Sequence, residues 1–340
     1  MTMSADRAGA DTTESYGGDD GKARVVVGID GSAGSRDALV HGLIAAAQRG
    51  ADLDVVTSYA IELYYLGDAP IDVPNVARIR EDTRARARAL VDDVQQEVAV
   101  SAVPGVRDVA MRLTVSEGPA AQVLVDRSEG ADLLVVGSRG RDAMRSMLLG
   151  SVALHCVTHA ACPVVVMHPS VGVSRPPRVV VGVDGSAGAR AALAAALDEA
   201  GRVDADVEVV VTYALADYWT DLATVFVPSV EEIRRDLQQR TERLVAAVLA
   251  ERPANRGSEA LSVRIVVVEG SAADVLIDRG RTADLLVVGS RGRGTLRGLL
   301  LGSVALRCAM HALCPVMVVH PLRTRSQAAP VSAEPAMADS

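Results

Sequence analysis

The sequence is poor in lysine and in aromatic residues, and both shortages limit the chemistry available to the chain. Lys22 is the only lysine among the 340 residues. A P-loop, a protein-kinase site and a Schiff-base enzyme each need a lysine within the site itself. Lys22 precedes the first predicted strand, so none of these sites can be built around it. Aromatic residues make up only 2% of the chain and its net charge is −8, which argues against a general nucleic-acid binder.

Long apolar runs and targeting signals are also absent. The longest apolar runs, such as residues 133–137 and 164–167, are far shorter than the roughly 18 residues that a membrane span needs. Residues 1–21 are acidic and lack the apolar core of a secretory signal or the arginines of a transit peptide. We therefore expect a cytoplasmic protein without a membrane partner. Its composition predicts a disordered leader over residues 1–22 and a disordered tail over residues 322–340.

What the chain does contain is an internal repeat. Residues 25–34 return as residues 179–188 with a single change, and residues 131–141 return unchanged as residues 283–293. The repeat is far too long for a solenoid, so it indicates a duplicated domain. We expect domains over residues 23–169 and 177–321, joined by a linker over residues 170–176.

Within each copy, strand-like apolar runs alternate with helical patterns. Strands buried on both faces are typical of a parallel sheet, and strand–helix alternation implies right-handed crossovers. In the first copy the patterns predict strands over residues 24–30, 53–59, 106–115, 133–137 and 164–167, and helices over residues 35–49, 76–100, 120–128 and 151–160. The fold class is therefore α/β, with two tandem doubly wound domains. Each is a five-stranded parallel sheet with helices on both faces.

Two glycine motifs follow the predicted fourth strand of each copy. Gly137 and Gly140 come directly after it, and Gly150-Ser151 begins the next helix. In an open α/β sheet, ligands bind beyond the carboxyl ends of the strands. Glycine lets the backbone approach an oxyanion closely, and a helix N-terminus offers unpaired N–H groups. The motifs therefore predict a phosphate site, and Ser151 could either cap the helix or bind the phosphate.

The same motifs have a simpler interpretation, in which Gly-x-x-Gly is a turn and Gly-Ser an ordinary helix cap. Their recurrence at identical spacing in the second copy favours the phosphate site. Arginines lie between the glycines of both copies and could neutralise a triphosphate, namely Arg139, Arg141 and Arg145 in the first and Arg291, Arg293 and Arg297 in the second.

These motifs resemble those of the universal stress protein family. The resemblance rests on Gly-x-x-Gly, nine residues and Gly-Ser in both copies, on the first strand ending in Gly28-Ile-Asp30-Gly-Ser, and on Cys162-Pro-Val-Val-Val. It covers nearly the whole chain except the two tails. The long motif marks the ATP-binding branch of the family, so the resemblance implies a Rossmann-like, adenine nucleotide alpha hydrolase-like fold that binds ATP.

The resemblance also implies a role for individual residues. Asp30 and Asp184 would accept a hydrogen bond from the adenine amino group, the backbone near Ser58 and Thr212 would border the base, and the first motif glycine would lie under the ribose. The first ATP site would comprise Gly28, Ile29, Asp30, Ser58, Gly137, Arg139, Gly140, Arg141, Gly150, Ser151 and Val152. The second would comprise Gly182, Val183, Asp184, Thr212, Gly289, Arg291, Gly292, Arg293, Gly302, Ser303 and Val304. Asp30 could instead form a helix cap or an Asx turn before Gly31.

A repeated cysteine and histidine pattern has the spacing of a zinc site. It comprises Cys156, His159, Cys162 and His168, and again Cys308, His311, Cys314 and His320. The predicted elements separate Cys162 from His168 by a whole strand, roughly 20 Å at 3.3 Å per residue, which is too far for a tetrahedral site. We expect reduced, buried thiols that pack the last helix, and no metal site.

Three functions fit these features. The first is a regulator whose ATP-dependent conformation controls a partner or the growth state, as the resemblance suggests. The second is a slow ATPase or a phosphate- or adenylyl-transferring enzyme, although no nucleophile–base pair recurs near both phosphate sites. The third is an interaction scaffold. We further expect the apolar last strands of the two copies to pair within one chain, because an exposed apolar edge is normally covered. We also expect a homodimer, an unidentified protein partner and Mg²⁺ bound together with ATP. No catalytic residue is assigned.

Overall fold

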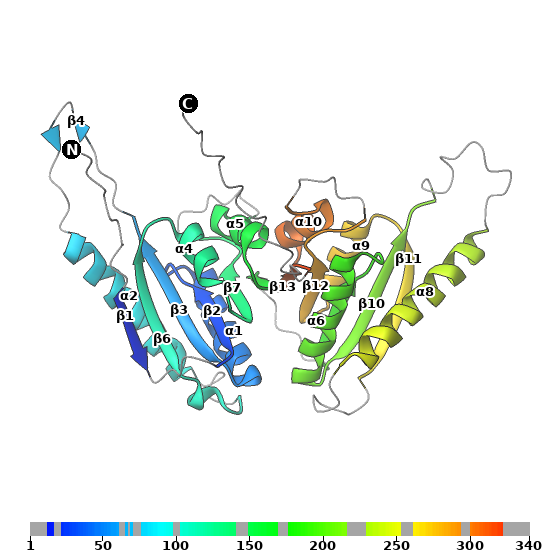
Figure 1. Ribbon diagram of the computed structural model, residues 1–340, viewed down its shortest axis with the longest axis horizontal. Coiled ribbons are helices and arrows are strands. Elements are labelled where there is room, and N and C mark those ends of the chain that lie inside the picture. Colours follow the sequence, from blue (N-terminus) through cyan, green and yellow to red (C-terminus); the bar gives the residue numbers. More distant parts are fainter. Residues whose placement is uncertain are drawn as a thin grey trace, which may run out of the picture.

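The computed structural model contains two α/β halves that lie side by side along the long axis of the molecule (Figure 1). It describes residues 12–16, 22–60, 65–66, 69–70, 76–97, 103–140, 149–168, 176–215, 229–252, 261–293 and 300–321. The expected linker, apart from Pro176, and the expected tail lie outside these residues. No helix in the described part of the chain is long and apolar enough to cross a membrane.

The first copy alternates strands and helices as its sequence predicts. Its strands are β2 (Arg24–Gly28), β3 (Asp52–Tyr59), β6 (Met111–Glu117), β7 (Leu133–Gly137) and β8 (Val164–Met167), and its helices are α1 (Ala33–Arg49), α2 (Val76–Gln96), α4 (Ala120–Arg127) and α5 (Ser151–His159). A two-stranded ribbon, β4 (Tyr65–Leu66) with β5 (Ala69–Pro70), and a short 3₁₀ helix, η1 (Val106–Asp108), lie in its connections.

The second copy repeats this order. Its strands are β9 (Arg178–Gly182), β10 (Asp206–Tyr213), β11 (Val263–Glu269), β12 (Leu285–Gly289) and β13 (Val316–Val319), and its helices are α6 (Ala187–Val203), α8 (Val230–Ala250), α9 (Ala272–Gly280) and α10 (Ser303–His311). The strand order is β6-β3-β2-β7-β8 in the first copy and β13-β12-β9-β10-β11 in the second, with parallel neighbours inside each copy. The doubly wound fold is therefore confirmed.

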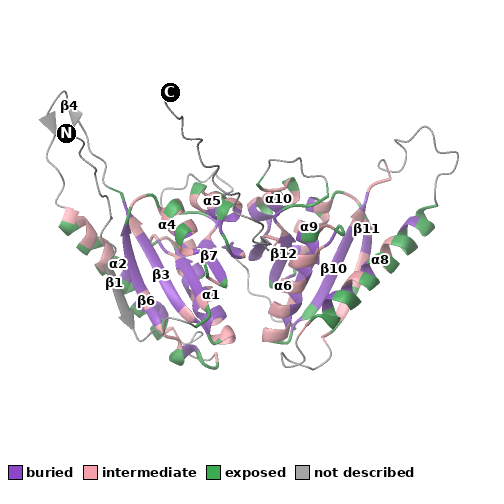
Figure 2. Ribbon diagram, viewed as in Figure 1, coloured by how far each residue is buried: buried purple, intermediate pink, exposed green. Residues whose placement is uncertain are grey.

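Each sheet is buried on both faces, as its continuous apolar strands predict. Val25 and Val27 contribute to a core that includes α1 and α2, whereas Val26 faces a second core that includes α4 and α5. Figure 2 shows the central strands of both sheets as buried, whereas the exposed residues lie mainly on the helices and connections; in the edge strand β11 only Val267 is buried. The order of the strands reverses between β2 and β7, which opens a space at their carboxyl ends.

The two sheets are joined into one through their last strands. β8 and β13 pair antiparallel, with Val164 opposite Val318 and Val166 opposite Val316. All four of these valines are fully buried. The expected pairing within one chain is thus confirmed, and it removes two apolar edges that would otherwise be exposed.

The first copy has an additional strand that the sequence analysis did not anticipate. Residues of the leader form β1 (Thr12–Tyr16), which pairs antiparallel with β6. β1 completes an 11-stranded sheet. These residues depart from the disordered segment expected for residues 1–22. The physical reason is that β6 would otherwise be an edge strand with unpaired N–H and C=O groups.

The boundaries differ most around β6. The sequence predicts a strand from residue 106, but the strand begins at Met111 and is preceded by η1. Val106 is buried at 7% exposure, so it contributes to the core without joining the ladder. Its apolar character was therefore a signal of burial and not of strand structure.

Candidate functional site

Each copy has a cavity at the carboxyl ends of its central strands. The cavity volume is about 280 Å³ in the first copy and about 380 Å³ in the second. Ligand pockets of proteins commonly have volumes of about 300–1,000 Å³. All the residues assigned from sequence to the first site line the first cavity, except Arg141, which lies outside the described residues. All those assigned to the second site line the second cavity. The structure thus brings both predicted sets together, while their roles toward a nucleotide stay predictions.

Asp30 forms the turn that links β2 to α1. Its Oδ1 accepts a hydrogen bond from the backbone N–H of Ser32 at 2.9 Å, which is an Asx turn. Ser32 is the N-cap of α1, and its Oγ accepts from the backbone N–H of Ser35. Gly31 has a φ of 84°, which glycine adopts without strain. The Asx turn, left open by the sequence, is therefore present, whereas the helix cap is Ser32 and not Asp30.

Asp184 shows how the equivalent carboxylate organises the second cavity. Its Oδ1 accepts from the backbone N–H of Ser186 at 2.9 Å, and its Oδ2 accepts from the backbone N–H of Arg293 at 2.8 Å. Burial acts to raise the pKa of Asp184, but these hydrogen bonds and the Arg293 charge lower it overall. The ionised carboxylate therefore ties the end of β9 to the loop after β12. Each carboxylate oxygen has two lone pairs, so acceptor capacity remains for a ligand.

The close approach of an Asp carboxylate explains why the second glycine of each Gly-x-x-Gly motif is needed. A Cβ on Gly140 would lie 2.8 Å from Oδ2 of Asp30, and one on Gly292 would lie 2.6 Å from Oδ2 of Asp184. Neither glycine has a positive φ. The sequence analysis offered both conformational freedom and close approach as reasons for these glycines. The structure supports close approach.

Gly137 and Gly289 have a packing role. A Cβ on Gly137 would lie 2.9 Å from the backbone carbon of Gly34, and one on Gly289 would lie 2.7 Å from that of Gly188. These contacts let the N-terminal turns of α1 and α6 approach the ends of β7 and β12. The contact of Gly137 and Gly289 with a ribose stays a prediction.

We call α5 and α10 the phosphate helices, because the sequence predicts that their first turns hold phosphate. Each begins with an open first turn. Gly150 is the N-cap of α5 and Gly302 that of α10, and neither helix has a side-chain cap. Ser151 is exposed and lies inside α5, so the capping alternative for its hydroxyl is not realised. The residues of this first turn line the cavity, and no side-chain cap accepts from their N–H groups. This arrangement is suited to an oxyanion.

Hydrogen bonds connect this first turn to the neighbouring strand ends. The N–H of Gly150 donates to the carbonyl of Ser138 at 2.8 Å, and the N–H of Ser138 donates to the carbonyl of Met167 at 2.8 Å. The second copy repeats both bonds, from Gly302 to Ser290 and from Ser290 to Val319. The start of each phosphate helix is thereby fixed to the last strand of its own copy.

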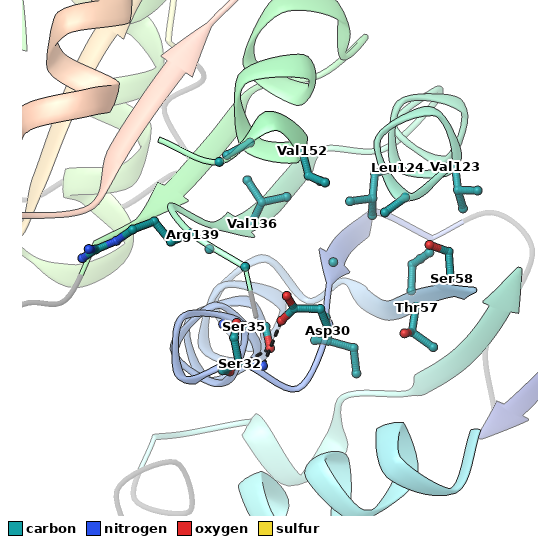
Figure 3. A pocket seen from close by; sticks show the side chains of 18 of the residues that line it. Asp30, Ser32, Ser35, Thr57, Ser58, Val123, Leu124, Val136, Arg139 and Val152 are labelled. Atoms are coloured by element: carbon teal, nitrogen blue, oxygen red, sulfur yellow. Dashed lines mark hydrogen bonds between the residues drawn. The ribbon is translucent and has the colours of Figure 1, made fainter. Parts of the chain in front are cut away.

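Sequence reasoning missed the apolar wall of the cavity. Val123 and Leu124 of α4 face the polar residues Asp30 and Ser58 across the first cavity (Figure 3). A Cβ on Gly28 would lie 2.7 Å from Cδ1 of Leu124, so α4 can approach the strand end only because residue 28 is glycine. Gly182 and Leu276 repeat this contact in the second copy. The apolar face of α4 was visible in the sequence, but its partner was not.

Arg139 lines the first cavity, and Arg291 and Arg293 line the second, while their role toward a phosphate stays a prediction. Arg139 is exposed, and in Figure 3 its side chain extends away from Asp30. The guanidinium of Arg293 lies beside Gly185, where an added Cβ would be 3.1 Å from Nη2. Arg145 and Arg297 lie outside the described residues.

The cysteines are free and buried, in agreement with thiols that pack the last helix of each copy. Burial raises the pKa of Cys156, Cys162 and Cys308 to about 12. Among the described residues, no group of three or more His, Cys, Asp and Glu side chains is arranged to hold a metal ion. His155 and His159 stack on α5 with ring centroids 4.3 Å apart, and Arg307 replaces His155 in the second copy.

Comparison with known proteins identifies the family. The model of the universal stress protein family matches residues 23–168 and again residues 177–320. The chain belongs to this family. Universal stress protein Rv2623 of Mycobacterium tuberculosis (strain ATCC 25618 / H37Rv) is 34% identical over 302 residues, which cover 86% of this chain and 95% of the relative. A universal stress protein of Mycolicibacterium smegmatis (strain ATCC 700084 / mc(2)155) is 31% identical over 306 residues, or 84% and 99% of the two chains.

A solved structure has the same tandem architecture. The universal stress protein from Archaeoglobus fulgidus DSM 4304 superposes with a TM-score of 0.59, covering 88% of this chain and 98% of its own. Its sequence identity is 19%. The likeness therefore concerns the fold.

Proposed function

We propose that this universal stress protein binds one ATP in each copy and that the bound nucleotide sets a conformation through which the chain acts in a stress response. One observation carries the proposal. Both copies combine an open helix start, a carboxylate at the end of the first parallel strand and an apolar wall around one cavity. The open helix start fits a phosphate, the carboxylate fits an amino group, and the apolar wall fits a base or ribose.

Different residues would bind different parts of the nucleotide. In the first copy, the N–H groups of Ser151 and Val152, with Gly140, would hold the phosphates, whereas Asp30 and Ser58 would border the adenine. The equivalent residues of the second copy are Ser303, Val304, Gly292, Asp184 and Thr212. A bound ATP would bring phosphate charge, and Mg²⁺ would be held mainly by the phosphates and water, because the acidic residue that lines each described cavity is the turn-forming Asp.

The composition of the cavities favours a regulator over an enzyme. Their described lining offers Ser and Thr hydroxyls and one carboxylate, without a histidine or cysteine beside them. A hydroxyl needs an adjacent base to become a nucleophile. Slow hydrolysis by positioning alone is the competing function. We also propose a cytoplasmic homodimer that transmits the nucleotide state to a protein partner.

Two experiments test this proposal, and the first uses the purified chain. We expect two ATP per chain by equilibrium dialysis with radiolabelled ATP, and negligible ADP release over hours. Rapid ADP release would replace the regulator with an ATPase, and the absence of bound ATP would favour the scaffold. Partner control is tested by comparing proteins captured from a lysate by the ATP-loaded and nucleotide-free chain. The same captured set in both states would contradict it.

A further inference from the structure

The histidines that end the Cys-x5-His pattern lie at the junction between the copies. His168 follows β8 and His320 follows β13. Because β8 and β13 run antiparallel, each histidine reaches the last helix of the other copy. Nε2 of His320 lies 3.1 Å from the carbonyl oxygen of Val157 on α5. His168 approaches the backbone of Ala309 on α10 in the same sense, without a hydrogen bond from its Nε2.

The carbonyl that His320 contacts belongs to the unsatisfied end of α5. The last four carbonyls of a helix lack partners inside it. The N–H of Ala161, four residues after Val157, donates instead to Oγ of Ser128 at 2.9 Å. A carbonyl can only accept, so Nε2 of His320 carries the proton in this contact. His320 thereby satisfies a helix end that belongs to the other copy.

The opposite end of the same helix begins the proposed phosphate site. α5 has nine residues, so about 13 Å separate its two ends at 1.5 Å per residue. A helix this short moves as one unit when either end shifts. Figure 1 shows α5 and α10 facing each other across the junction. The backbone route from Gly150 through Ser138 to Met167 reaches the other copy only by way of the β8–β13 ladder. The histidine side chains contact the last helix of the other copy directly.

We propose that His320 is a positioning residue for the first nucleotide site and His168 for the second, so that each copy orients the phosphate helix of the other. This inference rests on the proposed nucleotide binding. It gives the last histidine of each copy a structural role, although the pattern does not have the geometry of a zinc site.

The two contacts are unequal. The contact of His320 has good hydrogen-bond geometry, whereas Nε2 of His168 is buried without such a bond to any described residue. The interaction of His168 with Ala309 is therefore the weaker one. We expect the first site to depend more on His320 than the second depends on His168.

The experiment measures each site alone. Gly292→Val leaves only the first site and Gly140→Val only the second. His320→Ala is placed in both backgrounds, and ATP affinity is measured by calorimetry. In the first-site background we expect the Kd to rise roughly two- to tenfold, as for the loss of one hydrogen bond. In the second-site background, the copy that carries residue 320 itself, we expect no change. His168→Ala should reverse the pattern with a smaller effect.

His320→Gln is the conservative control, because its amide N–H can still donate to Val157. It should restore much of the first-site affinity, and it keeps the test available if His320→Ala does not fold. An equal loss at both sites, or a loss confined to the second site, would indicate general destabilisation and overturn the inference. If His320→Ala bound ATP with an unchanged first-site Kd, this inference would be overturned while the proposed function would stand. A parent chain that binds no ATP would overturn the proposed function and this inference together.

Discussion

The two cavities share their motif sequence but not their walls. Residues 131–141 and 283–293 are identical, yet the second cavity is larger, at about 380 against 280 Å³. In the first copy, Oγ of Ser35 accepts from the N–H of Gly31 at 3.1 Å. Ala189 occupies the position of Ser35 in the second copy, so the second turn lacks this hydroxyl. A duplicated motif thus fixes where a nucleotide would bind, whereas unrepeated neighbours decide the shape and polarity of each site.

The largest expected effect separates the two sites. Gly140→Val should remove ATP from the first copy and Gly292→Val from the second, lowering bound ATP from two to one per chain, because the side chain would collide with the carboxylate and occupy phosphate space. Loss of several charge-assisted hydrogen bonds, each worth about 1.5–3 kcal/mol, weakens binding by orders of magnitude. The free energy of unfolding should fall by only about 1 kcal/mol. If Gly140→Val retained two ATP with unaltered affinity, the motif would be only a turn followed by a helix cap.

The second comparison concerns the buried carboxylates at equivalent positions of β3 and β10. Glu208 forms ion pairs with Arg178, Arg264 and Arg279. Oδ2 of Asp54 lies 3.5 Å from Nη1 of Arg24 and 3.6 Å from Nη1 of Arg127. Both are almost fully buried. We expect Glu208→Ala to lower the free energy of unfolding by about 3 kcal/mol and Asp54→Ala by less, because Arg178 and Arg279 approach Glu208 more closely, at 3.3 and 2.9 Å, than Arg24 and Arg127 approach Asp54. Urea unfolding measures both, and equal losses would contradict this ranking.

A third effect concerns the stability of the chain in acid, which we expect to fall because of His168 in the first copy. Burial lowers the pKa of His168 to about 4, so the folded chain holds it neutral. The unfolded chain protonates it near pH 6.5, so stability is retained above that pH and lost as the pH falls toward 4. The loss should reach about 3 kcal/mol at most. Thermal unfolding of the parent chain and of His168→Asn between pH 7 and 4.5 measures it. Identical pH profiles would show that His168 does not contribute.

The smallest effect concerns the turn that differs between the copies. Ser35→Ala removes the acceptor of the Gly31 N–H and makes the first turn resemble the second. We expect the first-site affinity to weaken by about 1 kcal/mol, or roughly fivefold. Ala189→Ser is the matched variant and should leave the first site unchanged. If Ala189→Ser weakened ATP affinity at the first site more than Ser35→Ala does, the Ser35 hydroxyl would not organise that site.

The sequence alone determined the duplication, the α/β alternation and the position of the candidate site. Apolar runs predicted β7 and β8 with their observed bounds. Duplication at fixed spacing placed Gly140 and Gly150 at strand and helix ends. These signals are local or repeated, and local pattern reflects the backbone geometry of a single element.

Only the tertiary structure decided which distant residues meet. The contact of Gly28 with Leu124, the pairing of β1 with β6 and the contact of His320 with Val157 each join segments far apart in the chain. Apolar periodicity shows that a residue will be buried but not against which partner. His320 illustrates the reason: its spacing from Cys314 resembled a metal ligand, and the antiparallel junction instead directs it to a helix of the other copy.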